Sequence, residues 1–474
     1  MKARRKTMKT RRLGRREFLK IAGGSSVGLV LAACTGGSET EGVATESAPA
    51  ATDAPAIPTS TPMPEVTDLV FWHPFGGSRE PLMQEVIIDP FNSESPNTRA
   101  EQFLWTGGDR AEKFVAAVAA GTPPDVIMFP SGDMPAYADQ GAFLSLDDFI
   151  SSSGIDPDEI YYAAEINARR FKGTTYMLPT VTAAGQTIAY YNVARFEEAG
   201  HDPETPIRTW AEWEAIQEDF VDMTADPPGW FGNVDLISST RSFWIWLYLN
   251  GGKYLSDDLT EVAFSDERGI ETMQWIYDRM TSQADYADIN PGTATSDYLD
   301  SVRARFVSGQ TAVYIDGPWM FQQFADEYGM QLDQYRIHSA PYNDAHADAG
   351  LGAPTQGGWG NALPAGTNNP EASWEFIKFA TTTPASLAFT VEQGRPNPVK
   401  AFNADQAYYD VNPYWDMVLN IFESDFAIPV SAATAEINQL LVNMQDQVMY
   451  GQLSPEEALA EAAATAQRAL DSVS

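Results

Sequence analysis

Residues 68–72 read Asp-Leu-Val-Phe-Trp, a run of β-favouring residues that the sequence His-Pro-Phe-Gly-Gly interrupts at residues 73–77. The pattern predicts a buried strand that ends in a loop, with a helix from about Arg79. Residues 126–129, Val-Ile-Met-Phe, predict a second buried strand. Between them a helix is expected because apolar residues recur at helical spacing at Ala111, Phe114, Val115, Val118 and Ala119. Strand, helix and strand in this order indicate a parallel βαβ unit.

The same pattern resumes farther along the chain. Residues 187–191 (Thr-Ile-Ala-Tyr-Tyr) and 311–315 (Thr-Ala-Val-Tyr-Ile) predict further strands, with a helix from Thr209 between them. We therefore place the protein in the α/β class and expect the parallel βαβ arrangement to continue.

Helix starts are well marked in the second half of the chain. Thr209 with Glu212, and Ser454 with Glu457, have the spacing of capping boxes. Residues 437–448 and 456–470 are expected to form two helices that Gly451 separates.

The composition limits the classes of protein to consider. Of 474 residues, 44% are hydrophobic and one is Cys, so the chain can bury a large core but is neither a disulfide scaffold nor a Cys-ligated zinc protein. Residues 1–33 hold ten of the 30 basic and one of the 65 acidic residues, so the rest carries a formal charge of −44. Phosphate backbones and anionic lipids repel so acidic a body, which excludes general nucleic-acid binding. At this length two domains are expected.

The N-terminus has the pattern of a secretory signal. A basic segment precedes the apolar residues 21–33, which are fewer than the ~20 needed to span a membrane. Arg15 and Arg16, in Gly-Arg-Arg-Glu-Phe-Leu-Lys, resemble a twin-arginine export signal. Leu-Ala-Ala-Cys34 resembles a bacterial lipobox, in which the Cys becomes the lipid-bearing first residue. We expect residues 1–33 to be a lipoprotein signal peptide; the alternative is that Cys34 is an incidental small residue.

Residues 34–67 have the composition of a tether. After Cys34 the segment is almost wholly Gly, Ser, Thr, Ala, Pro and Glu, which cannot bury apolar area, so we expect it to be disordered. An acyl chain on such a tether anchors a protein without spanning the membrane. The expected location is therefore the outer face of the cytoplasmic membrane, at the cell surface or in a periplasm.

Short phrases spread from about residue 68 to the C-terminus carry a family resemblance. They are, in order, Phe71-Trp72-His73 before Gly76-Gly77, and residues 119–126, 141–148, 190–192, 196–200, 209–210, 306–312, 316–319 and 373–379. Each phrase is weak alone, but their order and spacing are specific. Together they resemble the extracellular solute-binding proteins of ABC transporters, in the large family that includes the maltose-binding protein.

This resemblance implies a periplasmic-binding-protein-like fold of two α/β lobes. Hinge segments would join the lobes, which would close on one solute in the cleft between them. By the family's pattern, one lobe comprises residues 66–183 and 358–405, and the other comprises residues 184–357 and 406–474. The implied partners are a small-molecule solute, the permease subunits of an ABC importer and, through the lipid, the membrane. The protein would be a monomer without a cofactor.

Candidate ligand-binding residues follow the predicted strands, because open α/β sheets bind ligands beyond the carboxyl ends of their strands. In residues 73–79, 130–133 and 316–319 they are His73, Ser78, Arg79, Ser131, Asp133, Asp316 and Trp319. A sugar needs polar partners for its hydroxyls and an aromatic surface for its C–H faces, and twelve Trp residues suit that demand.

Further candidates come from aromatic and loop positions. Trp244 lies in an aromatic run, and one of its two Trp residues is expected to face the cleft. The resemblance makes Trp319 a stacking aromatic and adds Trp359, Trp415, Arg395 and Asn397. Each has a structural alternative: the Trp side chains could pack within a lobe, the Asp side chains could order turns, Arg395 could pair with surplus carboxylates, and His73 could be an ordinary loop histidine.

The implied function is capture of a mono- or oligosaccharide for import, with no catalytic or metal-binding residues. The main alternative is a polyamine or other cationic solute, which an aromatic box with carboxylates would bind. A secreted carbohydrate-active enzyme is less well supported, because no motif marks a catalytic pair. Adjacent tyrosines at 161–162, 190–191 and 408–409 resemble those of iron-binding relatives, but Tyr190 and Tyr191 are neighbours in a predicted strand and so face opposite ways. A structural lipoprotein would need no hinge.

Overall fold

The computed structural model describes residues 66–106, 110–182, 186–237, 240–292, 295–350, 352 and 354–473. Met63–Ser474 forms one compact unit. The predicted signal peptide and most of the tether, with Arg15, Arg16 and Cys34, lie outside the described residues. Within the described residues, no helix is long and apolar enough to cross a membrane.

The first sheet has five strands in the order β2-β1-β3-β14-β6. Strand β1 pairs in parallel with β2 and β3, whereas β14 runs antiparallel to β3 and β6. The bounds are β1 Thr67–His73, β2 Thr98–Leu104, β3 Val126–Pro130, β6 Met177–Val181 and β14 Trp359–Ala362. The two predicted strands and their parallel pairing are confirmed.

Strand β2 was missed by the sequence analysis. It is an edge strand that pairs only with β1, and alternate side chains such as Arg99, Glu101 and Phe103 are exposed. Its polar composition follows from that exposure and hides the strand from a search for apolar runs.

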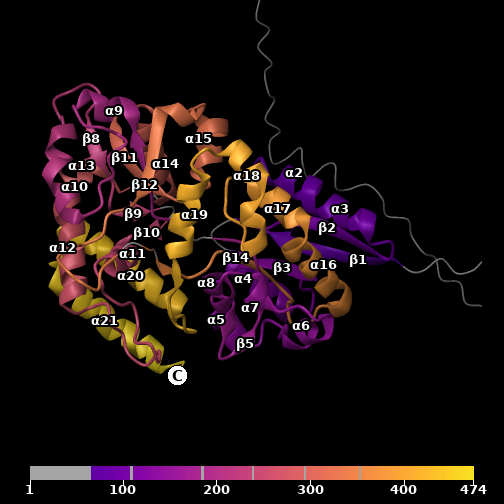
Figure 1. Cartoon of the computed structure of the whole chain (residues 1–474). Helices are drawn as coiled ribbons and strands as arrows, with labels where there is room; N and C mark the ends of the chain where they lie inside the picture. The colour runs from indigo at the N-terminus through magenta and orange to yellow at the C-terminus, as the bar shows by residue number, and fades with distance from the viewer. Residues whose placement is uncertain are drawn as a thin grey trace, which may run out of the picture. The chain divides into compact units, whose positions relative to one another are not determined.

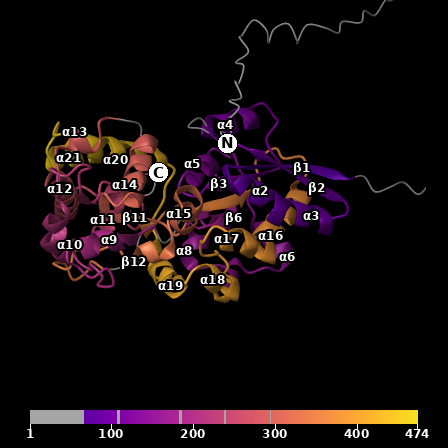
Figure 2. The ribbon, with the colours of Figure 1, turned by 90° about the horizontal axis from the view of Figure 1, so that it is seen from above.

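Helices cover the first sheet, and some come from the second half of the chain. The turn after β1 leads into α2 at Arg79, as predicted. Figure 2 shows α16 and α17 beside the N-terminal helices, and α16 contacts both β1 and α3. The bounds are α2 Arg79–Met83, a π-turn at Gln84–Ile88, α3 Asp89–Glu94, α4 Arg110–Ala119, α5 Met134–Asp139, α6 Asp147–Ser153, α7 Pro157–Ile160, α8 Ala163–Asn167, α16 Pro370–Thr382 and α17 Pro384–Val391.

Helix α4 confirms the predicted helix but not its full apolar stripe. Phe114 is completely buried, whereas Val115 is 42% exposed. The helix buries a narrower face than its sequence pattern indicates.

The second sheet has four strands in the order β12-β7-β11-β8. The bounds are β7 Ile188–Asn192, β8 Trp230–Gly232, β11 Thr311–Asp316 and β12 Tyr335–Ser339. The predicted strands at 187–191 and 311–315 exist, but they pair antiparallel, which corrects the expected parallel arrangement. The chain passes through β8 before it reaches β11, so the parallel pairing falls between β8 and β11 instead.

Helices surround the second sheet on the left of Figure 1. Both predicted capping boxes are present, at Thr209 with Glu212 and at Ser454 with Glu457. The bounds are α9 Val193–Glu198, α10 Trp210–Gln217, α11 Phe243–Leu249, α12 Glu267–Thr281, α13 Tyr286–Ile289, α14 Thr295–Val307, α15 Met320–Tyr328, α18 Gln406–Val411, α19 Trp415–Ser424, α20 Thr434–Met449 and α21 Pro455–Asp471. The two predicted C-terminal helices, split at Gly451, are confirmed as α20 and α21.

Short strand pairs and turns complete the described elements. They are β4 Arg170–Phe171, β5 Thr174–Thr175, β9 Leu236–Ile237, β10 Thr240–Arg241, β13 Pro354–Thr355 and β15 Phe426–Ala427, with 3-10 turns at Glu218–Phe220, Leu332–Gln334 and Lys400–Ala404. Strand β13 pairs with β15 next to the segment that leads into β14.

Each sheet has its own hydrophobic core. The core of the second sheet contains Trp210, Trp213, Trp246 and Trp275, and the rings of Trp210 and Trp275 stack at 4.1 Å. Two further clusters form the core on the two faces of the first sheet. Part of the Trp content that suggested sugar binding therefore serves packing.

Buried Arg169 joins the two strand ends at which the chain leaves and re-enters the first sheet. Its guanidinium pairs with Glu165 at 2.7 Å, and both side chains are fully buried. One guanidinium nitrogen also donates to the carbonyl oxygens of Val181 (3.4 Å) and Trp359 (3.3 Å). These bonds fix the ends of β6 and β14, where the chain crosses between the sheets.

Candidate ligand-binding site

Trp319 is held in place by the turn that follows β11. It is the N-cap residue of α15, and its indole lies against Gly317, where an added Cβ would be 2.2 Å from the ring. Any other residue at 317 would displace the indole. The hydroxyl of Tyr190 donates to the carbonyl oxygen of Gly317 at 2.8 Å, which anchors the turn to the core.

The buried side chain of Asp316 stabilises this turn through hydrogen bonds. Its carboxylate is fully buried and accepts hydrogen bonds from the Tyr314 hydroxyl (2.6 Å) and the Gly317 amide (2.7 Å). Arg303 lies 3.7 Å from the same carboxylate. Burial raises the pKa of Asp316, while the charge of Arg303 opposes that shift. With its oxygens engaged, Asp316 acts as a turn residue rather than as a ligand contact.

Arg395 lies in the loop after α17 and is 7% exposed. Its guanidinium carbon is 4.7 Å from the ring centroid of Trp319 and 5.8 Å from that of Phe75. Among the described residues, none accepts a hydrogen bond from this side chain, and its Nε atom is buried without a partner. Burial, and secondarily the charge of Arg79, lower the pKa of Arg395 to about 9.

Ser78 and Arg79 follow β1 and stand at the start of α2. The Arg79 guanidinium lies 5.3 Å from the centroid of Phe75, whose ring is 5% exposed. Burial lowers the pKa of Arg79, which the charge of Glu327 partly offsets. Phe75 therefore lies between two guanidinium groups and holds both by cation–π contact.

These side chains line one small cavity, which we name the Trp319 cavity. Loops of the first sheet form one side and α15 forms the other; the lining residues are Ser78, Arg79, Trp319, Gln322, Gln323, Asp326, Glu327, Gln393 and Arg395. The Oε1 atoms of Gln323 and Gln393 are buried, and no described residue donates a hydrogen bond to them. The free volume is about 20 Å³, room for about one water molecule. A larger ligand requires the two sides to move apart.

A second group of polar and aromatic residues adjoins the cavity through Phe75. The Phe75 ring is 6.0 Å from that of Trp359, and the Arg110 guanidinium lies 5.3 Å over Trp359. Asp133, at the start of α5, is half-buried, and burial raises its pKa while Arg110 lowers it. Ser131 is fully buried and donates to the carbonyl oxygen of Gly358 at 3.0 Å, so it fixes the loop.

The structure does not bring every predicted residue to the site. His73 is fully buried; its ring contacts the Gln102 side chain at 2.9 Å and accepts from the Phe75 amide at 3.3 Å. Burial lowers the pKa of His73 to about 4, so the ring is neutral. Asn397 is fully buried, and its amide donates to Thr390 at 3.0 Å. Both side chains are structural.

The other two aromatic candidates lie in or against the core of the second sheet. Trp415 is fully buried, stacks on Tyr408 at 3.9 Å and donates to the carbonyl oxygen of Asn403. Trp246, in the same aromatic run as Trp244, donates to the carbonyl oxygen of Val234 inside the core. Trp244 is half-buried and packs against that core, and it is not among the residues that line the Trp319 cavity.

Some site residues were missed by the sequence analysis. Phe75 carried a signal, because it lies in the predicted loop after the first strand. Gln323, Gln393 and Arg110 carried none, since nothing in a single sequence marks a Gln or Arg that lacks a partner after folding.

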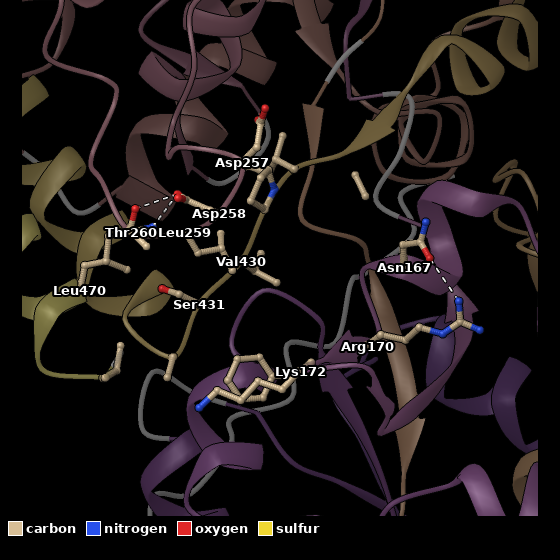
Figure 3. A pocket seen from close by; sticks show the side chains of 16 residues that line it. Asn167, Arg170, Lys172, Asp257, Asp258, Leu259, Thr260, Val430, Ser431 and Leu470 are labelled. Atoms are coloured by element: carbon tan, nitrogen blue, oxygen red, sulfur yellow. Dashed lines mark hydrogen bonds between the residues drawn. The ribbon is translucent and has the colours of Figure 1, made fainter.

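A larger cavity than the Trp319 cavity lies elsewhere. This cavity, which we name the Lys172 groove, has a volume of about 590 Å³ and is lined by Asn167, Arg170, Phe171, Lys172, Asp257, Asp258, Leu259, Thr260, Ala427, Ile428, Pro429, Val430, Ser431, Ala432, Leu470 and Val473. Figure 3 shows Arg170 and Lys172 on the side opposite Asp258 and Leu470. Arg170 pairs with Asp158 and Lys172 with Asp139. None of the predicted site residues lines this groove.

The described residues do not provide a cluster of side chains that matches the metal-binding alternatives. Within the described residues, no group of three or more His, Cys, Asp or Glu side chains is placed to hold a metal ion. The hydroxyls of Tyr190 and Tyr191 are buried and bonded to the backbone at Gly317 and Ile207. His338 and His346 bond separately, to Pro203 and Glu271.

Comparisons with known proteins agree with this architecture. Residues 76–386 match the family described as bacterial extracellular solute-binding protein. The chain is 26% identical over 147 residues to the sn-glycerol-3-phosphate-binding periplasmic protein of Rhizobium meliloti (strain 1021), which covers 31% of this chain and 34% of that protein. It is 24% identical over 277 residues to the maltotriose-binding protein of Pyrococcus abyssi, which covers 56% of this chain and 53% of that protein. The chain thus matches about a third to a half of the length of these curated relatives.

The fold also resembles solved structures. An ABC transporter solute-binding protein from Thermotoga lettingae bound with α-D-tagatose has a TM-score of 0.70 at 23% identity, over 85% of this chain and all of that one. The predicted two-lobe periplasmic-binding-protein-like fold, with hinge segments and a cleft between the lobes, is confirmed. The residue boundaries of the lobes stay a prediction.

Proposed function

This chain belongs to the family of bacterial extracellular solute-binding proteins, and from that premise we propose that it binds a carbohydrate between its lobes and delivers it to an ABC importer. The observation that carries the proposal is the Trp319 cavity. It joins loops of both sheets, and it combines an aromatic ring with buried polar atoms that lack partners in Gln323, Gln393 and Arg395. Leaving such atoms unpaired is costly, so a polar ligand that pairs with them gains binding energy.

The chemistry of the lining suits a compound rich in hydroxyl groups. Amide and guanidinium groups offer planar hydrogen-bond partners, and the indole offers a surface for C–H groups. The named ligands of the relatives, maltotriose, tagatose and sn-glycerol 3-phosphate, share this character. The small free volume supports a binding step in which the lobes separate to admit the solute and close around it.

A cationic solute is disfavoured by the charges in the cavity. Arg79 and Arg395 line it and repel each other, and a polyamine would add like charge there, whereas the two lining carboxylates, Asp326 and Glu327, are exposed to solvent. The family binds solutes rather than transforming them, and the proposed role requires no catalytic residue or cofactor.

The proposal extends to the N-terminus. Export by the twin-arginine route, removal of residues 1–33, lipidation of Cys34 and a tether ending near residue 67 would hold a monomeric receptor at the outer face of the cytoplasmic membrane. Metabolic labelling with a fatty-acid analogue tests this: a Cys34→Ala variant is expected to lose the label, and a labelled variant would contradict it.

The solute class is tested by thermal-shift and Trp-fluorescence screens of the full chain carrying Cys34→Ala. The panel comprises mono- and oligosaccharides, sn-glycerol 3-phosphate, polyamines and ferric ion. A ligand at 100 times its Kd adds ~2.7 kcal/mol of stability, which a thermal scan detects. Stabilisation by a carbohydrate with a change in Trp emission supports the proposal. Stabilisation by polyamines alone would overturn the solute class.

A further inference from the structure

No described residue accepts a hydrogen bond from Arg395 or forms an ion pair with it. The side chain is 7% exposed, and in the described part of the chain it has neither a hydrogen bond nor an ion pair. A guanidinium has five N–H donors and keeps its charge, so burying it without an acceptor is expensive. In a chain with 65 acidic residues, an unpaired buried arginine is not explained by a shortage of carboxylates.

The nearest acidic candidate is already engaged. Asp316 lies close enough to influence Arg395 electrostatically, but its carboxylate accepts from Tyr314 and Gly317 and lies 3.7 Å from Arg303. Its charge is therefore shared with Arg303. Arg395 is left with an excess of positive charge around it.

A second arginine adds to this excess. Arg79 lines the same cavity, contacts the same Phe75 ring and disfavours the charged form of Arg395. Two guanidinium groups brought together without an anion repel each other, whereas a shared anion attracts both.

The acidic residues of α15 stand at the rim of the cavity. Asp326 and Glu327 are exposed, and the attraction between Glu327 and Arg79 is screened by solvent. Neither carboxylate forms an ion pair with Arg395. Among the described lining residues, the buried acceptors without a hydrogen-bond partner are the amide oxygens of Gln323 and Gln393, which suit hydroxyl groups.

We propose that the solute carries an anionic group, a carboxylate or a phosphate, that binds Arg395 and Arg79, while its hydroxyl groups bind Gln323 and Gln393. Both anions fit, because guanidinium groups bind planar carboxylates and phosphates in two-pronged fashion. The aromatic rings of Phe75 and Trp319 hold the guanidinium groups in position before the ligand arrives. This inference rests on the proposed function and names the solute class within it.

The test compares matched neutral and anionic compounds by isothermal titration calorimetry on the full chain carrying Cys34→Ala. The pairs are glucose with glucuronate, glucose with glucose 6-phosphate, galactobiose with digalacturonate, and glycerol with sn-glycerol 3-phosphate. We expect the anionic member of at least one pair to bind tenfold or more tightly than its neutral partner. Preference for uronates or for phosphates distinguishes the two sources of the anion.

Variants locate the anion. Arg395→Gln is expected to remove the preference for the anionic member, Arg395→Lys to retain part of it, and Arg79→Gln to weaken it. Lys172→Gln, in the Lys172 groove, is the matched control, because it removes a cation outside the cavity and is expected to leave the preference unchanged. Raising the salt concentration about tenfold, from roughly 0.05 to 0.5 M, is expected to weaken the binding of the anionic compounds and to leave the binding of the neutral compounds unchanged.

The outcomes separate this inference from the proposed function. Equal binding of neutral and anionic sugars, unaffected by Arg395→Gln, overturns the anionic solute but leaves a carbohydrate receptor. Binding of simple organic acids or inorganic phosphate without any sugar retains the anion site and overturns the carbohydrate. Failure of every pair to bind contradicts both.

Discussion

The Trp319 cavity is much smaller than the Lys172 groove, yet the cavity and not the groove contains the buried polar atoms without partners among the described residues. The groove has a volume of about 590 Å³ and the cavity about 20 Å³. In the groove, Arg170 and Lys172 already form ion pairs with Asp158 and Asp139. In the cavity, the buried Nε atom of Arg395 has no hydrogen-bond partner among the described residues. The two regions therefore differ in hydrogen bonding as well as in size: the cations of the groove are paired, whereas buried polar atoms of the cavity keep unused hydrogen-bonding capacity among the described residues.

Among the proposed variants, removal of the Trp319 indole is expected to change solute affinity most. Trp319→Ala removes an aromatic surface and a support of Arg395, so we expect solute affinity to fall about 100-fold or more. Gly317→Ala should act in the same direction, because its methyl group would displace the ring. Titration of the solute found in the screen measures both.

The groove supplies the control for that experiment. The double variant Lys172→Ala and Val430→Ala alters side chains that line the groove and is expected to change affinity less than about twofold, as for groups outside a binding hot spot. If the groove variant lost binding and Trp319→Ala kept it, the assignment of the two regions would be reversed.

His73 offers a contrast to Arg395, because it is a buried polar side chain that has hydrogen-bond partners. Burial lowers its pKa to about 4. Between about pH 6.5 and pH 4 the histidine is therefore protonated in the unfolded chain but neutral in the native chain. The associated stability is fully present above about pH 6.5 and is lost as the pH falls toward 4, by up to ~3 kcal/mol.

We expect the wild-type protein to lose about 2–3 kcal/mol more stability than His73→Gln between pH 7 and pH 4.5. Urea unfolding at the two pH values measures the difference. Parallel loss in both proteins would mean that His73 is not held neutral by burial.

Arg395→Gln is expected to shift stability less than the protonation of His73 does, and in the opposite direction. Removing a buried charge without a partner should raise the free energy of unfolding of the solute-free protein by about 1–2 kcal/mol, while it weakens solute binding. Arg170→Gln in the groove breaks a half-exposed ion pair with Asp158 and should cost less than about 1 kcal/mol. Thermal unfolding without solute compares the two; destabilisation by Arg395→Gln would indicate a structural partner for that side chain.

Local sequence patterns predicted many elements correctly. The strands β1, β3, β7 and β11 are apolar runs because they are buried, and the capping boxes at Thr209 and Ser454 need only residues three positions apart. Strand β2 escaped because an edge strand carries polar residues. The antiparallel pairing of β7 and β11 escaped because strand direction depends on the path of the chain between them.

The site was predicted in part for the same reason. Positions after strands led to Arg79 and Trp319, and the family resemblance led to Arg395; the cavity brings all three together. His73 and Trp415 were equally plausible in sequence, yet both are buried and bonded within their lobes. Whether a polar or aromatic side chain faces a cavity depends on neighbours far away in the chain.

The α/β class, the family resemblance and most buried strands can be predicted from the sequence, because they follow from local apolar patterns and from the order of short phrases. Which polar groups find partners depends instead on how the chain folds. Asp316 contacts Tyr314 and Arg303, and His73 contacts Gln102, whereas Arg395 finds no acceptor in the described part of the chain. Hydrogen-bond satisfaction is a property of the assembled neighbours, which no stretch of sequence contains.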